Sequence, residues 1–117
     1  MMINFTSSIE DIFYKQREFQ RMLGNDVPTD DPNMLAHHLL GLVTEIGEVA
    51  QADKRWKRNK RNDHFDYNEK LKEIADCFIF LINVCLYSNI SFYQLLTATE
   101  SKIEENIERY KKSEENK

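Results

Sequence analysis

Two pairs of acidic residues, each pair spaced three residues apart, place the strongest constraint on how this chain can fold. The first pair is Glu45 and Glu48, and the second is Glu73 and Asp76. Each pair lies in a stretch of helical periodicity, and residues at i and i+3 share one face of a helix. If the two helices pack face to face, four carboxylates converge, and that much negative charge requires a cation. The chain is therefore expected to bring two consecutive helices together around a charged cluster.

The composition favours one domain that consists of long helices. The 117 residues suit a single domain over residues 1–117, and the low counts of 3 glycines and 2 prolines leave room for few turns. The most apolar stretch, residues 77–86, is too short to span a bilayer and is interrupted by Asn83. Residues 1–8 do not resemble a signal peptide, so we expect a cytoplasmic location. A net charge of -4 argues against general nucleic-acid binding.

The hydrophobic periodicity predicts four helices, which gives an all-α fold. The expected ranges are 8–23, 33–56, 68 to 88 or 89, and from residue 92 onward, with a polar connection at 59–67 and a frayed tail at 111–117. Ser7 or Ser8 is the expected cap of the first helix, Gly24 its end, and Ser91 the cap of the fourth.

The third helix is predicted to be buried on all sides, because residues 77–86 are apolar nearly all round. One short chain has too few helices to surround it, which favours a homodimer or a larger assembly. Cys77 and Cys85 lie about 12 Å apart along this helix, too far for a disulfide between them. We expect them to be small core residues in a reducing compartment.

The predicted ligand set points to Mg²⁺, with Mn²⁺ as a substitute, because carboxylate oxygens are hard donors. A di-iron bundle would show Glu-x-x-His on two of its helices, and here Glu48 and Asp76 occupy the fourth positions. The histidines have no zinc-like spacing with the two cysteines. His38 is expected to be a packed or surface residue, although it shares one flank of the second helix with the acids and with Trp56.

An acidic pair on a helix is often only part of a solvated surface. Glu45, however, lies among apolar residues, and the second pair comes directly before an apolar helix. Gly47, inside the first motif, costs roughly 1 kcal/mol relative to alanine in a helix interior. A close approach of backbone or ligand would explain that glycine.

A metal-bound polyphosphate also needs cationic partners, and the sequence has two sources of them. Lys102 and Arg109 lie on one face of the fourth helix. The segment 54–61 is strongly basic, and its alternative interpretation is a solvated helix end whose cations complement the helix dipole.

Together these residues resemble the all-α nucleoside triphosphate pyrophosphohydrolases, which include MazG and the dimeric dUTPases. The family pattern Glu-x-x-Glu followed by Glu-x-x-Asp stands here at residues 45–48 and 73–76. A Lys-x-x-x-Asn-x-x-Arg-Tyr signature of several members is similar to residues 102–110, and the resemblance covers about residues 34–110.

The resemblance implies a four- to five-helix bundle that forms a homodimer or a dimer of dimers (a homotetramer), with sites near the subunit interfaces. It implies Mg²⁺-dependent cleavage between the α- and β-phosphates of a nucleoside triphosphate, giving the monophosphate and pyrophosphate, as in house-cleaning of the nucleotide pool. It assigns the metal to Glu45, Glu48, Glu73 and Asp76, with Glu45 also orienting or deprotonating the attacking water. The candidate substrate contacts are Gln16, His38, Lys54, Trp56, Lys102, Asn106, Arg109 and Tyr110.

The resemblance leaves the substrate open between a pyrimidine deoxynucleotide and a damaged nucleotide. Gln16 and Gln20 resemble the first-helix glutamine of the dUTPase branch, which contacts the base in those proteins. Residues 54–57 are loosely similar to a segment of the same branch that contains lysine and tryptophan. The short chain and the fourth-helix signature are closer to MazG-like and dCTP-cleaving members. Trp56 either stacks on a base or caps the core. Two alternatives to the pyrophosphohydrolase are a non-catalytic helical interaction module and a metal-dependent phosphatase acting on nucleoside monophosphates.

Overall fold

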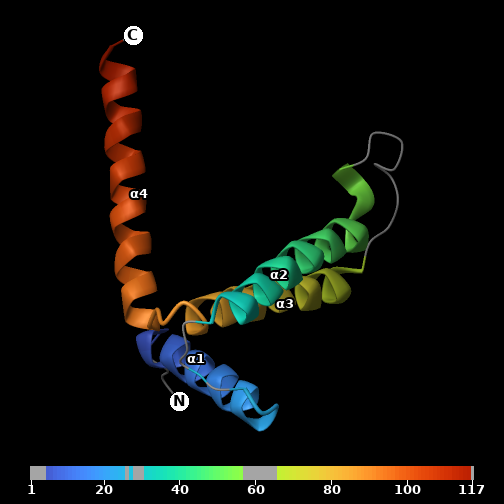
Figure 1. Cartoon of the computed structure of the whole chain (residues 1–117). Coiled ribbons are helices and arrows are strands. Elements are labelled where there is room, and N and C mark those ends of the chain that lie inside the picture. Colours follow the sequence, from blue (N-terminus) through green and yellow to red (C-terminus); the bar gives the residue numbers. More distant parts are fainter. Residues whose placement is uncertain (1–4, 26, 28–30, 57–65, 117) are drawn as a thin grey trace.

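The computed structural model describes residues 5–25, 27, 31–56 and 66–116, and in that part of the chain every regular element is helical. The elements are α1 (Phe5–Met22), α2 (Pro32–Ala52), the short 3-10 helix η1 (Lys54–Trp56), α3 (Tyr67–Leu86) and α4 (Phe92–Glu115) (Figure 1). The predicted all-α class with four long helices is confirmed. Most of the predicted polar connection at 59–67 lies outside the described residues.

Polar caps define where three of the helices begin. Asp31 caps α2 by accepting hydrogen bonds from the backbone N–H groups of Asn33 and Met34, and a proline occupies the first helical position. Asp66 caps α3 in the same way. Ser91 and Gln94 form a reciprocal capping box at the start of α4, which confirms the predicted cap.

The predicted cap of the first helix is wrong. The helix is already formed at Phe5, so Ser7 and Ser8 lie inside it. The second helix, expected over residues 33–56, begins at Pro32, because Asp31 caps it there, and it ends at Ala52, with Lys54–Trp56 in the separate η1. At the other end of the chain α4 continues to Glu115, through most of the tail that was expected to fray.

Helices α2 and α3 form the central element, a hairpin in which the two helices run side by side (Figure 1). They approach closely at Gly41, where a Cβ atom would overlap the ring of Phe80. Helix α1 packs across the C-terminal half of α3. The small core lies at this junction and consists of Phe13, Val27, Ile82, Cys85, Leu86 and Tyr87.

Helix α4 leaves the other helices after its first turns (Figure 1). Phe92 and Leu95 pack on the core, whereas every residue from 97 to 116 is exposed. The radius of gyration is 17.9 Å, against roughly 13 Å for a compact chain of this length. The predicted bundle is therefore not closed within one chain.

Residues 77–86 are not buried on all sides within the single chain, as expected if one chain has too few helices to surround them. Only four residues of α3 are buried, Ile82, Asn83, Cys85 and Leu86. Phe78 is 43% exposed and Leu81 38%, because α1 and α2 cover only one side of α3. Large apolar side chains are likewise exposed on α2, namely Leu39, Leu40, Val43 and Ile46.

Both cysteines are free: Cys77 is half-buried and Cys85 is buried. None of the helices in the described residues combines the length and apolar character that a membrane span requires.

Candidate metal centre and adjoining cavity

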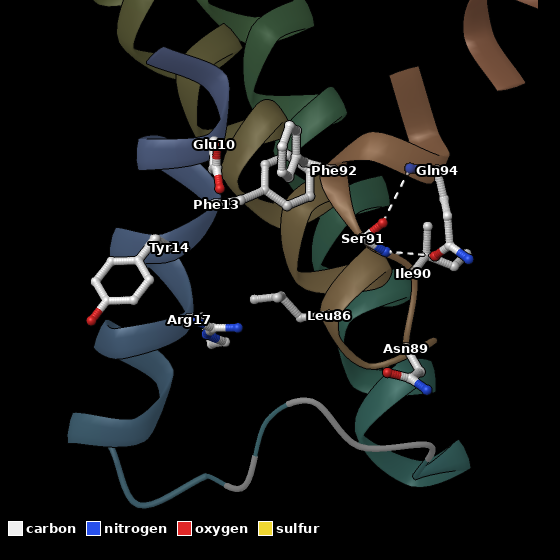
Figure 2. A pocket seen from close by; sticks show the side chains of 10 residues that line it. All are labelled: Glu10, Phe13, Tyr14, Arg17, Leu86, Asn89, Ile90, Ser91, Phe92 and Gln94. Atoms are coloured by element: carbon white, nitrogen blue, oxygen red, sulfur yellow. Dashed lines mark hydrogen bonds between the residues drawn. The ribbon is translucent and has the colours of Figure 1, made fainter. Parts of the chain in front are cut away.

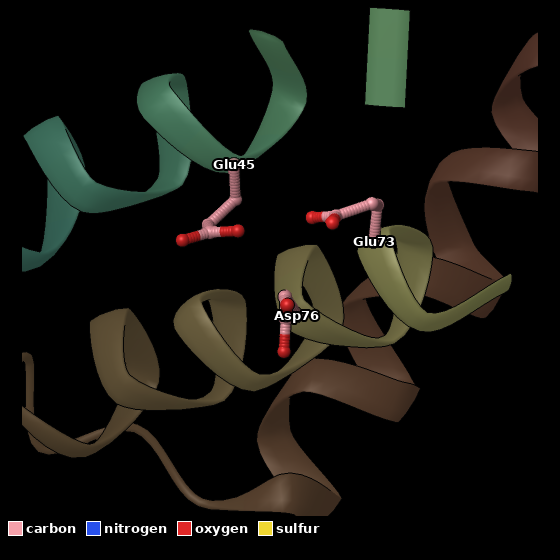
Figure 3. Close-up of side chains that lie close together, drawn as sticks. All are labelled: Glu45, Glu73 and Asp76. Carbon is pink, nitrogen blue, oxygen red and sulfur yellow. The ribbon is translucent and has the colours of Figure 1, made fainter. Parts of the chain in front are cut away.

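Three of the four predicted acids meet between α2 and α3. One carboxylate oxygen from each of Glu45, Glu73 and Asp76 lies within 4.8 Å of the other two. The three side chains are half-buried and converge on the space between the two helices (Figure 3). The local reason is helical: Glu73 and Asp76 are one turn apart on α3, and Glu45 faces them from α2. Three hard oxygen donors at this spacing fit a divalent cation such as Mg²⁺.

The electrostatics of this cluster are unfavourable without a cation. Desolvation raises the pKa of the Glu73 carboxyl, and the neighbouring Glu69, Asp76 and Glu48 raise it further. Among the described residues, none of the three clustered carboxylates forms an ion pair with a lysine or arginine. The cluster therefore concentrates negative charge that the described part of the chain does not neutralise.

Glu48 lies at the edge of the cluster. Its side chain is exposed, and it is not part of the three-carboxylate group, although its charge acts on Glu73. Gly47 beside it has open space where a Cβ would lie, so close packing within the described chain does not explain this glycine. The glycine that packing requires is Gly41, which lies earlier on the same helix against the ring of Phe80.

The basic segment after α2 is partly engaged in an ion-pair cluster. Asp53 accepts from Arg55 at 2.8 Å and from Lys70 of α3 at 3.0 Å, which ties the end of α2 to the start of α3. These two cations hold the pKa of Asp53 well below its usual range, with the hydrogen bond from Arg55 as the largest cause. Lys54 is exposed. Lys57, Arg58, Lys60 and Arg61 lie outside the described residues.

Trp56 does not cap the core of this chain. It is 63% exposed, and its indole Nε1–H donates to the backbone oxygen of Ala50 at 3.0 Å. Of the two interpretations made from the sequence, the core cap is therefore wrong within one chain.

A cavity of about 300 Å³ adjoins the hairpin between α1, α2 and α3. Its polar wall comes from Gln16, Gln20, Asn25, His37, His38 and Asn83, and its apolar wall from Phe19, Leu23, Met34, Ile79 and Phe80. Phe80 and Ile79 follow Asp76 by one turn on α3, so the cavity lies next to the carboxylate cluster along the hairpin. Two of the predicted substrate contacts, Gln16 and His38, line it.

The polar wall of the cavity is held by a network of hydrogen bonds. Gln16 Nε2 donates to Asn83 Oδ1 at 2.9 Å, and Asn83 Nδ2 lies 3.3 Å from His38 Nδ1. Gln20 Oε1 accepts from the Tyr87 hydroxyl at 2.9 Å and from Asn25 Nδ2 at 2.9 Å. Asn83 and Gln20 are 2% and 4% exposed, so these are buried amides that have hydrogen-bond partners.

His38 is a packed residue, as one of the sequence-based interpretations expected. It is 5% exposed, and its ring stacks on Tyr87 with centroids 4.7 Å apart. Burial lowers the pKa of its imidazole, and His37 lowers it further. Its Nε2 atom is buried and has no hydrogen-bond partner in the described part of the chain.

The fourth-helix signature is not brought to the carboxylates within one chain. Lys102, Asn106, Arg109 and Tyr110 are all exposed on the part of α4 that leads away from the hairpin. Both cations of this group point to one acid of the same helix: Glu105 lies 3.7 Å from Lys102 and 3.2 Å from Arg109.

A larger cavity, of about 550 Å³, lies between α1 and the start of α4 (Figure 2). It is lined by Phe13, Tyr14, Leu86, Phe92 and other residues, with the Arg17 guanidinium 5.2 Å from the Tyr14 ring. None of the acidic pairs lines it, so its size does not make it the candidate site.

Sequence reasoning missed several residues of this region. Asn83 was noted only as an interruption of an apolar run, although an amide in such a run signals a buried polar contact. Asp53 and Lys70 had no motif to reveal them, because their pairing joins two helices across the undescribed connection.

Comparison with known proteins identifies a family for the chain. A family model described as dUTPase matches residues 8–116 of the chain. Neither a curated protein nor a solved structure shows a significant match.

Proposed function

Because the chain belongs to the all-α dUTPase family of the MazG-like superfamily, and the family implies a nucleotide pyrophosphohydrolase, we propose a specific reaction for it. The protein cleaves a (deoxy)nucleoside triphosphate between the α- and β-phosphates and releases the monophosphate and pyrophosphate, in house-cleaning of the nucleotide pool. The observation that carries the proposal is the convergence of Glu45, Glu73 and Asp76 from two helices.

The carboxylate cluster is the proposed metal site, with Mg²⁺ as the cation. Its three oxygen donors suit Mg²⁺, and desolvation together with the neighbouring acids raises the pKa of Glu73, as expected for a carboxyl group without a counter-charge. A bound cation supplies charge neutralisation for phosphate oxygens and makes water a better nucleophile at neutral pH. Glu48, whose charge acts on Glu73 from the edge of the cluster, is the proposed fourth ligand.

Glu45 is the proposed catalytic residue. It is the single member of the three-carboxylate group that α2 contributes, so it faces the other two acids across the interhelical space (Figure 3). From that position its carboxylate orients the attacking water or accepts a proton from it.

The amide-lined cavity is the proposed site of the base, with Gln16 and His38 as contacts. His38 precedes Glu45 by seven residues, a rise of about 10 Å along α2. This separation suits a nucleotide whose phosphates meet the carboxylates and whose base enters the cavity. Polar groups between aromatic and aliphatic walls are typical of sites for small ligands.

The remaining proposed contacts, Lys54, Trp56 and the fourth-helix group Lys102, Asn106, Arg109 and Tyr110, require an assembly. We propose a homodimer or homotetramer that covers the exposed apolar residues of α2 and α3 and brings α4 of one copy near the acids of another. The exposed length of α4 and the open shape of the single chain support this. Light scattering of the purified protein tests it: a monodisperse monomer at micromolar concentration would exclude it.

The deciding experiment is a hydrolysis panel over standard and modified (d)NTPs, with and without Mg²⁺, in which both nucleotide and phosphate products are identified. We expect the monophosphate and pyrophosphate from a pyrimidine deoxynucleotide. Asp76→Ala and Glu48→Ala should abolish pyrophosphate release and leave the helical circular dichroism unchanged, and full activity in either variant would exclude the proposal. Release of inorganic phosphate from monophosphates would instead indicate a phosphatase. No Mg²⁺-dependent change in thermal stability would favour a non-catalytic interaction module.

A further inference from the structure

A lysine lies close to the carboxylate cluster along the hairpin but is paired with an acid outside it. Lys70 comes about one helix turn before Glu73 on α3, a rise of about 4.5 Å, and residues at i and i+3 share one face of a helix. Its ammonium group is nevertheless directed across the hairpin, where Nζ lies 3.0 Å from Oδ2 of Asp53 at the end of α2. The lysine is therefore within one turn of a member of the cluster and does not neutralise it.

The Asp53 carboxylate is fixed in this position by its other contacts. Its Oδ1 accepts from Arg55 Nε at 2.9 Å and from the Arg55 backbone N–H at 3.1 Å, and its Oδ2 accepts from Arg55 Nη2 at 2.8 Å. A bidentate pair between arginine and a carboxylate has a defined geometry. The Asp53 side chain is only 13% exposed, and its backbone N–H donates to the oxygen of Val49 in α2. These contacts hold the carboxylate where it meets Lys70.

The carboxylate cluster is the alternative partner of Lys70. Within the described residues, the charged groups that act on the Glu73 carboxyl are all acidic, namely Glu69, Asp76 and Glu48. A lysine released from Asp53 would be drawn to that negative charge, and a pair at i and i+3 on one helix is within reach. An ammonium group in the cluster would occupy a carboxylate that the metal needs, and its charge would repel a divalent cation. A lysine at this position therefore competes with the metal unless another acid holds it.

We propose that Asp53 is a positioning residue of the metal site: secured by Arg55, it holds Lys70 away from the carboxylate cluster, which stays available to a divalent cation. The inference rests on the proposed function, because it assumes that the cluster binds Mg²⁺ or Mn²⁺. Asp53 acts without contacting the cation, through the direction that it gives to the Lys70 side chain. The ion pairs that tie the end of α2 to the start of α3 thus also protect the metal site from its own chain.

The test measures the affinity for Mn²⁺, which an all-oxygen site accepts in place of Mg²⁺, from the electron paramagnetic resonance signal of the free ion without nucleotide. Asp53→Asn keeps an oxygen for the Arg55 backbone N–H but removes the charge that pairs with Lys70. Its dissociation constant for Mn²⁺ should be at least about fivefold higher than that of the wild type. In Asp53→Asn/Lys70→Gln the competing ammonium group is absent, and the constant should return to within about twofold of the wild-type value. If Asp53→Asn does not fold, Asp53→Ser makes the same comparison.

Asp53→Asn/Lys72→Gln is the matched control. It has the same net charge as Asp53→Asn/Lys70→Gln, and Lys72 lies exposed on the same helix. We expect this control to bind Mn²⁺ about as weakly as Asp53→Asn alone. Equal restoration by the two second substitutions would show a general effect of net charge and would overturn the inference.

A purely structural role for Asp53 makes a different prediction. A loosened hairpin would misplace the carboxylates whatever side chain stands at position 70, so neither second substitution would restore the affinity. That result, or an unchanged affinity in Asp53→Asn, would overturn the inference. If the wild-type protein shows no Mn²⁺ binding that depends on Asp76 and hydrolyses no triphosphate, the proposed function itself is overturned.

Discussion

The two halves of the α2–α3 hairpin hold their polar groups in opposite ways. In one half, Glu45, Glu73 and Asp76 are crowded together, and no cation of the described residues pairs with them. In the other half, the buried amide of Asn83 forms hydrogen bonds to other side chains, and so does the buried amide of Gln20 on α1, which packs against this half. The first arrangement opposes folding and is suited to binding a cation, whereas the second stabilises the fold and presents fixed atoms to a ligand. One half of the hairpin therefore needs a bound cation to balance its negative charge. In the other half, most polar side chains already have hydrogen-bond partners within the chain.

The largest expected effect is on catalysis in the acidic half. Asp76→Asn keeps the size of the side chain but removes a charged ligand, so kcat/KM for the best triphosphate should fall at least about 100-fold. Thermal stability in EDTA should stay the same or rise slightly, because one repelling charge is removed. Steady-state kinetics and a thermal melt on the same sample measure both. A large loss of stability in EDTA would show that the acids support the fold instead of opposing it.

The second prediction concerns the response to metal. Mg²⁺ at 100 times its dissociation constant should stabilise the wild-type protein by about 2.7 kcal/mol, because it binds the folded state. Asp76→Asn should lose this response, whereas Tyr87→Phe, in the other half of the hairpin, should keep it. Denaturant titrations with and without Mg²⁺ provide the measurement. An equal response in the two variants would mean that the cation binds elsewhere.

The third prediction tests the amide half by stability alone. Gln20→Leu leaves the Tyr87 hydroxyl and Asn25 without their acceptor, and should cost about 1–3 kcal/mol of unfolding free energy. Tyr87→Phe removes one of the two donors but leaves Gln20 bonded to Asn25, and should cost about 1 kcal/mol. Chemical denaturation of the two variants shows whether the order holds. The reverse order would mean that the Gln20 amide contributes little.

Gly41 and Gly47, both on α2, allow a matched test of a glycine that packing requires against one that it does not. A Cβ at Gly41 would overlap Phe80, so Gly41→Ala should destabilise the protein by about 1–3 kcal/mol. A Cβ at Gly47 meets open space, so Gly47→Ala should stabilise it by up to about 1 kcal/mol through helix propensity. If Gly47 leaves room for a bound ligand, the same variant should bind triphosphate more weakly despite its higher stability. Unfolding and binding measured together separate the two roles.

The smallest effect is a dependence of stability on pH. Burial lowers the pKa of His38 below its ordinary value near 6.5, so just below that pH the unfolded chain binds a proton that the folded chain does not. Unfolding free energy should therefore fall as the pH drops below 6.5. His38→Gln should reduce this slope, while His37→Gln, at the neighbouring exposed position, should keep most of it. Equal slopes in the wild type and His38→Gln would show that another group is responsible.

Much of the fold could be predicted from the sequence because helices are local structures. The apolar periodicity gave four helices, and the residues at the start of α4 identified Ser91 as its cap. The prediction for α1 was wrong because a serine pair resembles a cap whether the helix begins there or earlier. Residues 77–86 are only partly covered within one chain, as expected, and the apolar pattern of the sequence does not show which element covers the rest.

Part of the candidate site could also be predicted from the sequence. Spacing along α3 was sufficient to place Glu73 and Asp76 on one face, and the structure adds that Glu45 meets them. Whether the Glu48 side chain also reaches the cluster depends on how α2 is rotated about its axis relative to α3. The spacing of residues within one helix does not determine that rotation. The same rotation buries His38 against Tyr87 and aligns it with Asn83, a relation between residues 45 positions apart that no local pattern contains.

The sequence by itself determined the four helices, most of their ends and the two acid pairs, because hydrogen bonding, capping and i, i+3 spacing act within a few residues. Only the tertiary structure decided which acids converge, that Gly41 and not Gly47 is required by packing, and that hydrogen-bonded, buried polar side chains line the adjoining cavity. These features depend on the distance and rotation between packed helices, which side chains far apart in the sequence set jointly.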